Sequence, residues 1–223
     1  LDDDTLVIVT SDNGPWFEGS TAGLRDRKGG AGWEGGYRVP FLARQPGRIP
    51  AGLISDSMAM NIDLLPTLAR WTGLPVPSAQ LDGADISSLL TLRAAPSPHD
   101  ELIFFINEDV AAIRTQRYKL VVRSFYRSLL APLDTRDDWQ VLVDLQNDPE
   151  ESYDVSSRHP DVLADLTARL GRARATFDPL KTPAVAAPEP KAADAKPPEA
   201  KAVAAKAAET KAPEPKKPEP AKT

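Results

Sequence analysis

The chain has 223 residues, enough for one large domain or two small ones. It contains no cysteine, so disulfides are excluded and cysteine usage gives no indication of the redox compartment. No apolar run approaches the roughly 20 residues that a membrane span requires. The net charge is −5, and residues 1–182 carry 19 basic and 26 acidic side chains. This acidic body gives no electrostatic footprint for nucleic acid.

The first unbroken apolar run, LVIVT at residues 6–10, predicts a strand buried on both faces of a parallel sheet. The run leads directly into Asp12, Asn13 and Gly14. Ligands of open α/β sheets gather just beyond the carboxyl ends of the strands. An adjacent carboxylate and amide offer oxygen ligands that suit Ca²⁺ or Mg²⁺. The alternative is that Asp-Asn-Gly forms only a turn after a strand.

A glycine-rich loop with Lys28 follows, and then the sequence WEGG. The compact ammonium of Lys28 could neutralise an anion held by a metal at the strand end. The alternative is a solvated loop lysine beside Arg25 and Arg27. We expect Glu34 and Arg38 to be scaffold charges that orient this loop.

The rest of the first block, to about residue 95, has α/β character. We predict a short strand at 37–43 and a helix from the N-cap Asp63 to about Trp71, ended by Gly73. The apolar face of this helix is expected to pack in the core; it consists of Leu64, Leu65, Leu68 and Trp71.

The second block predicts an α+β unit with an antiparallel sheet and a closing helix that starts at Pro160. The strand candidates are 102–107, 111–115, 118–123 and 140–145. The helix carries one apolar stripe, formed by Val162, Leu163, Leu166 and Leu170. His159 is expected to cap this helix or lie at the surface, and His99 is a weaker candidate for a substrate cleft.

From Pro183 the sequence is almost entirely Ala, Pro, Lys and Glu. Such a segment buries too little apolar surface to offset its ordering entropy, which predicts disorder. We interpret it as a solubilising tail, with a spacer or a polyanion-contacting arm as the alternative.

Three blocks of the chain resemble sulfatases of the arylsulfatase type, within the alkaline phosphatase-like superfamily. They are TLVIVTSDNGPW, LRDRKGGAGWEGGYRVPFLARQPGRIPAG and NIDLLPTLARWTGLP, with weaker echoes in AAIRTQRYKLVV and VLVDLQNDPEES. The resemblance covers roughly residues 1–180 and implies an α/β fold. It implies the end of the sulfatase sheet domain at 1–95, a small α+β antiparallel C-terminal subdomain at 96–180 and a disordered tail at 181–223.

In this family the Asp-Asn pair supplies oxygen ligands to a divalent cation, which assigns Asp12 and Asn13 to Ca²⁺, with Mg²⁺ as the alternative. The family lysine that contacts the sulfate oxygens and the nucleophile matches Lys28, as a catalytic and substrate-binding residue. One departure concerns the loop: family members commonly have K-G-x-x before the aromatic residue, whereas KGGAG precedes Trp33 here.

The family nucleophile is a formylglycine made from a cysteine or serine in C/S-x-P/A-x-R, and this chain contains no such pattern. The resemblance therefore implies a C-terminal portion of a sulfatase that hydrolyses sulfate esters and is inactive alone, its nucleophile lying in a missing N-terminal part. The substrate would be a sulfated small molecule or glycan. The alternatives are a phosphodiesterase or phosphonate hydrolase of the same superfamily, a non-catalytic sulfatase-derived binding module, and a protein that interacts through its tail. Many such sulfatases are exported, but the sequence leaves a periplasmic or secreted location open.

Overall fold

The computed structural model describes residues 2–76, 80–124 and 139–182. They belong to a compact unit that runs from Leu1 to Pro183. Residues 183–223 of the predicted disordered tail lie outside the described residues. No helix among the described residues has the length and apolar character needed to cross a membrane.

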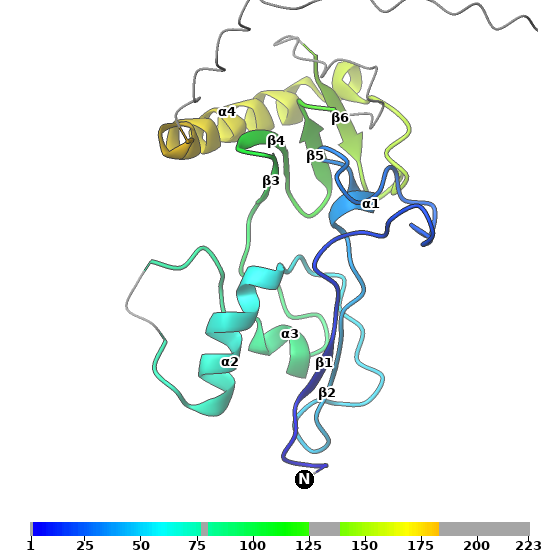
Figure 1. Ribbon diagram of the computed structural model, residues 1–223. Coiled ribbons are helices and arrows are strands. Elements are labelled where there is room, and N and C mark those ends of the chain that lie inside the picture. The colour runs from blue at the N-terminus through cyan, green and yellow to red at the C-terminus, as the bar shows by residue number, and fades with distance from the viewer. Residues whose placement is uncertain (1, 77–79, 125–138, 183–223) are drawn as a thin grey trace, which may run out of the picture. The chain divides into compact units, whose positions relative to one another are not determined.

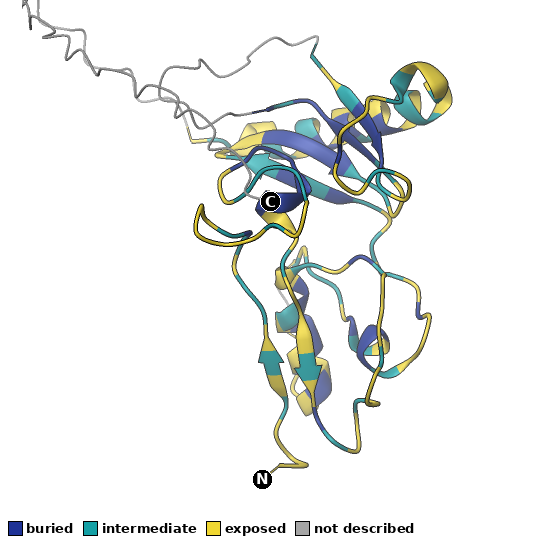
Figure 2. Cartoon of the chain, turned by 90° about the vertical axis from the view of Figure 1, so that its right-hand side faces the viewer, coloured by how far each residue is buried: buried dark blue, intermediate teal, exposed yellow. Residues whose placement is uncertain are grey.

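The first block contains a two-stranded sheet in which β1 (Val7–Val9) pairs antiparallel with β2 (Leu42–Arg44). Figure 1 shows the two strands side by side. Val7 and Val9 are 45% and 56% exposed. Figure 2 colours the exposed parts of the chain yellow. The prediction of a parallel strand buried on both faces is thus wrong for the described chain, because β1 pairs antiparallel with β2 and one of its faces is exposed, while Ile8 on the other face is only half-buried.

The predicted strand at 37–43 also needs correction. The WEGG sequence forms a single helical turn, α1 (Glu34–Tyr37), and the chain becomes extended again only after Pro40, where β2 begins. The predicted strand therefore began too early, because Tyr37 belongs to the helical turn and Pro40 has no amide hydrogen to donate to a strand ladder.

Helix α2 (Leu64–Thr72) confirms the helix predicted after Asp63, and a 3₁₀ turn precedes it. It ends at Gly73, whose φ of 73° places it in the left-handed region that favours glycine. The predicted core face is only partly correct, since Trp71 is buried while Leu65 and Leu68 are 53% and 38% exposed. A short helix that the sequence did not predict, α3 (Ser87–Thr91), buries Leu89 and Leu90.

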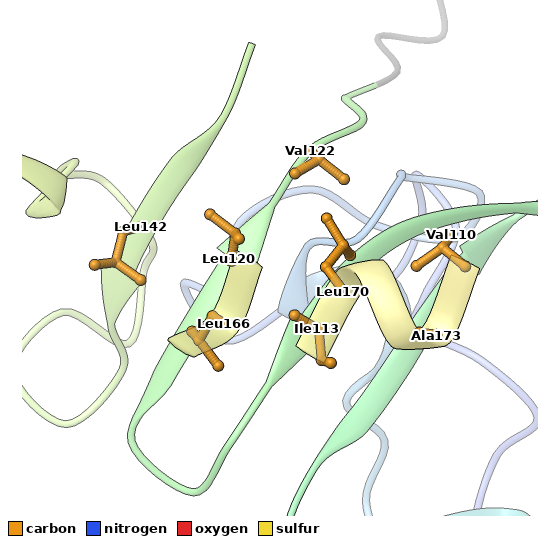
Figure 3. Close-up of a cluster of buried hydrophobic side chains, with 8 residues drawn as sticks. All are labelled: Val110, Ile113, Leu120, Val122, Leu142, Leu166, Leu170 and Ala173. Atoms are coloured by element: carbon orange, nitrogen blue, oxygen red, sulfur yellow. The ribbon is translucent and has the colours of Figure 1, made fainter. Parts of the chain in front are cut away.

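The second block is a four-stranded antiparallel sheet with consecutive strand order, as predicted. Its strands are β3 (Leu102–Ile106), β4 (Asp109–Arg114), β5 (Tyr118–Val121) and β6 (Val141–Asp144). Helix α4 (Pro160–Phe177) confirms the predicted closing helix. It packs Leu166, Leu170 and Ala173 against Val110, Ile113, Leu120, Val122 and Leu142 (Figure 3).

The other face of this sheet packs against the first block. Alternate strand residues form a second cluster there. The cluster includes Trp33 from the Lys28 loop, which runs from Arg25 to Gly36. The strand members are Leu102, Phe104, Ala112, Val121 and Val143. Because successive side chains of a strand point to opposite faces, α4 and the Lys28 loop cover the two sides of one sheet. This packing is what positions the loop.

Candidate functional site

The two loops that carry the predicted site residues are joined by backbone hydrogen bonds. One loop follows β1 and contains the Asp12–Asn13 pair; the other runs from Arg25 to Gly36 and contains Lys28. The amide of Gly14 donates to the carbonyl oxygen of Gly36 over 2.8 Å. The amide of Lys28 donates to the carbonyl oxygen of Pro15 over 3.0 Å. Residues far apart in the sequence are thereby brought to one place.

Glycine is required where these loops meet. A Cβ atom added to Gly14 would lie 1.9 Å from the carbonyl oxygen of Gly35. A Cβ atom on Gly35 would lie 2.2 Å from the carbonyl oxygen of Asp26. Such distances are far inside van der Waals contact, so a side chain at Gly14 would push the two loops apart and one at Gly35 would distort the Lys28 loop itself.

The predicted site residues differ in their exposure to solvent. Asp12 and Lys28 are exposed and Asn13 is half-buried. The Ser11 hydroxyl donates to the carbonyl oxygen of Asn13 over 2.9 Å. The Asn61 side chain donates to the carbonyl oxygen of Ser11 over 2.9 Å, which ties the Asp12–Asn13 loop to the turn that precedes α2. The backbone of this loop is therefore fixed while its side chains remain accessible.

The donor chemistry fits part of a cation site. A carboxylate and an amide oxygen are the hard ligands that Ca²⁺ and Mg²⁺ take, but Ca²⁺ requires about 6–8 oxygens. Within residues 2–76, 80–124 and 139–182, no three His, Cys, Asp or Glu side chains are grouped so that they could hold a metal. Asp12 and Asn13 can thus contribute ligands to a cation whose remaining ligands come from other groups or from water.

A cluster of buried charges lies beneath the Lys28 loop. Lys119 on β5 is fully buried, with its Nζ 3.0 Å from Glu34 Oε1 and 2.8 Å from Glu151 Oε1. Arg114 on β4 donates to Glu34 Oε2 over 2.8 Å. Burial acts to raise the pKa of Glu34, but Lys119 and Arg114 outweigh it and hold the pKa below its usual value. Burial raises the pKa of Glu151 despite the nearby ammonium.

The expectation that Glu34 is a scaffold charge agrees with these contacts, whereas Arg38 is exposed. Sequence reasoning missed the roles of Lys119 and Glu151. The one available signal was a lysine inside an otherwise apolar strand, YKLVV. A lysine on a strand whose two faces are both covered must be paired with acids.

Both histidines contact other side chains of the fold. His99 Nε2 lies 2.8 Å and 2.9 Å from the two carboxylate oxygens of Asp63, which is fully buried. Asp63 also accepts from the amides of Met60 and Ala84. Asp63 therefore joins His99 to two segments of the first block. His159 occupies the N-cap position of α4 but makes no side-chain capping hydrogen bond, and its ring centre lies 5.4 Å from that of Tyr118.

Comparison with known proteins gives the family of the chain. Residues 1–74, which include both loops, match the Sulfatase family model. Human arylsulfatase A is 37% identical over 190 residues, which cover 74% of this chain and 36% of the relative. Mouse steryl-sulfatase is 32% identical over 207 residues, covering 77% of this chain and 33% of the relative. The chain belongs to the sulfatase family, and it spans about a third of the length of these curated relatives.

Solved structures agree in fold. The PsFucS1 sulfatase of a Pseudoalteromonas species superposes with a TM-score of 0.70 at 27% identity, over 79% of this chain and 38% of that one. The Ps i-CgsB structure has a TM-score of 0.60 at 27% identity, over 77% of this chain and 36% of that one. The predicted fold class, an α/β sulfatase portion followed by an antiparallel α+β unit, is confirmed.

Proposed function

We propose that this chain supplies part of the active site of an enzyme that hydrolyses sulfate esters. Lys28 would contact the sulfate group, and Asp12 and Asn13 would bind the divalent cation, Ca²⁺ or alternatively Mg²⁺. The formylglycine nucleophile would lie in a part of the protein outside these residues, because residues 1–223 contain no C/S-x-P/A-x-R pattern. On this proposal the 223 residues alone have no turnover. The observation that carries it is the direct backbone pairing of the two loops.

The chemistry of the three side chains suits a sulfate ester. A compact ammonium beside a non-bridging sulfate oxygen neutralises charge that would otherwise repel an attacking oxygen. The cation, when bound, would add positive charge on the same anion. Exposure of Asp12 and Lys28 leaves both groups free to meet a substrate. Fixed backbones beneath them reduce the reorganisation that binding requires.

We propose a sulfated small molecule or glycan as the substrate class. Relatives include arylsulfatases and steryl-sulfatases, and Ps i-CgsB has also been solved in complex with k-i-k-neocarrahexaose. Phosphodiester or phosphonate hydrolysis is the alternative within the same chemistry, because those substrates also present anionic oxygens to a lysine and a cation. A non-catalytic binding module would retain the anion contact without turnover.

The test compares Lys28→Ala with Lys181→Ala in the complete protein that carries these residues. Lys181 is a matched control because its ammonium pairs with Asp109 and Asp178, away from both loops. We expect Lys28→Ala to lower kcat/KM for an aryl sulfate by roughly 10²–10³-fold, the size seen when one preorganised charge stabiliser is removed. Lys181→Ala should remain within about twofold of wild type.

Equal activity of the two variants would contradict the assignment of Lys28. Assaying the same proteins with an aryl phosphodiester and an aryl phosphonate separates the alternatives, since a sulfatase should prefer the sulfate ester. Absence of turnover on all three substrates, with retained binding of inorganic sulfate that requires Lys28, would support the binding module.

A further inference from the structure

The Lys28 loop is held against the antiparallel sheet by charged side chains that are buried or nearly so. Glu34 comes from the loop, Arg114 and Lys119 come from β4 and β5, and Glu151 follows β6. Lys119 contacts both glutamates and lies 4.4 Å from the centre of the Phe104 ring. The four groups therefore join the first block to two strands and a turn of the second.

Glu151 holds the loop backbone as well as its charge. Its Oε2 accepts from the Glu34 amide over 2.7 Å. Its main-chain carbonyl oxygen accepts from the Arg25 guanidinium over 2.7 Å. The backbone of Glu151 has a φ of 56°, in the left-handed region that disfavours residues with a Cβ. Local strain of this kind persists only where surrounding contacts fix the residue.

A buried charge network is a poor way to gain stability, because well-packed apolar residues usually serve as well or better. What such a network provides is one defined arrangement, since each buried charge must keep its partners. Here the arrangement fixes the turn at Glu34, and that turn fixes both loops. The Gly35 amide donates to the Arg25 carbonyl oxygen over 2.8 Å, and the Gly36 carbonyl oxygen accepts from Gly14.

We propose that Glu151 and Lys119 are positioning residues for the site. Through Glu34 they set where Lys28 and the Asp12–Asn13 pair lie relative to each other, so the second block is the template on which the site loops are assembled. What these loops bind rests on the proposed function, whereas the positioning itself does not.

The first measurement is hydrogen–deuterium exchange in the complete protein, followed in segments 10–17 and 24–37. Glu151→Gln keeps an oxygen that can accept from the Glu34 amide but removes the charge beside Lys119. Glu151→Asp keeps the charge but shortens its reach by one methylene. Because hydrogen bonds to charged groups are among the stronger ones in proteins, we expect both variants to exchange about tenfold faster or more in these segments. Segment 102–121 should keep its protection.

Asp144→Asn is the matched control. Asp144 lies on the same sheet and makes a two-point ion pair with Arg117, with Nε–Oδ1 and Nη2–Oδ2 distances of 3.0 and 2.7 Å. Its described contacts are with the turns beside β5 and β6 and not with the loops. Its exchange in segments 10–17 and 24–37 should match wild type.

The second measurement is a double-mutant cycle on kcat/KM for an aryl sulfate. If Glu151 acts in part by positioning Lys28, Glu151→Gln should lower kcat/KM by a clearly smaller factor in the Lys28→Ala background than in the wild type. A merely structural role would lower activity by the same factor in both backgrounds.

Two results would overturn the proposal. The first is wild-type protection of both loop segments in both Glu151 variants, and the second is equal loosening of these segments in Asp144→Asn. If Glu151→Gln also loses protection across segment 102–121, Glu151→Asp decides instead, because it keeps a charge to pair with Lys119. Retained protection of the loops in that variant would count against the proposal. A wild type without sulfate ester turnover would contradict the proposed function, while the exchange experiment would still decide the positioning.

Discussion

At the scale of single residues, the chain shows how small side chains allow the site loops to meet. The turn at Gly14 and the paired glycines Gly35 and Gly36 were recognisable from the DNG and EGG sequences. Their mutual contact was not, because it depends on how the chain returns from Arg25 to Gly36. Lys119 was less predictable still, since its burial follows from the Lys28 loop covering one face of the sheet and α4 covering the other.

The close approach predicts opposite effects of adding one methyl group at two glycines. Gly14→Ala would place its Cβ 1.9 Å from the Gly35 carbonyl oxygen, so we expect it to lower the free energy of unfolding by about 1–3 kcal/mol. Gly171→Ala lies within α4 with open space around the new atom and should raise that free energy by about 0.5–1 kcal/mol. Urea unfolding of both variants checks this. Stabilisation by Gly14→Ala would show that the loops are not in contact.

At the scale of elements, local patterns predicted the second block well and the first block less well. Alternating strands with short turns identified the antiparallel sheet, and the stripe containing Leu166 and Leu170 identified α4. The first block departs from its local pattern because partners far along the chain decide its structure. An apolar run could not reveal that β1 pairs with β2, and the leucines of α2 could not reveal which face is covered.

The ends of β5 and β6 give a prediction that depends on pH. Hydrogen bonds from Arg117 hold the pKa of Asp144 down to about 2 from its ordinary 3.8. Since the folded pKa is lowered, the stabilisation is fully present above the ordinary pKa and is lost as the pH falls through about 2. We expect Asp144→Asn to cost about 1 kcal/mol at near-neutral pH, a value reduced for solvent screening because Arg117 is half-exposed.

Urea unfolding of wild type and Asp144→Asn over a series of acidic pH values measures this difference directly. The two stabilities should converge below about pH 4. A difference that stays constant, or that grows on acidification, would show that Arg117 does not hold this carboxylate ionised.

At the scale of the whole molecule, the described chain divides its tasks between two blocks. The first block carries the candidate site side chains on two loops, and the second block fixes these loops through buried charges and the Trp33 contact. The first block leaves three apolar strand residues exposed, namely Val7, Val9 and Leu42. Family membership and the length covered agree with about a third of a sulfatase. We propose that Asp12, Asn13 and Lys28 together form one site that binds an anion and a cation.

The most direct test is a crystal structure of the complete protein grown with calcium chloride and inorganic sulfate. We expect a cation bound to side-chain oxygens of Asp12 and Asn13, and a sulfate within hydrogen-bonding distance of Lys28 Nζ. Parallel crystals of Asp12→Ala should lack the cation. A cation and a sulfate bound elsewhere, with these three side chains left in solvent, would contradict the proposed site.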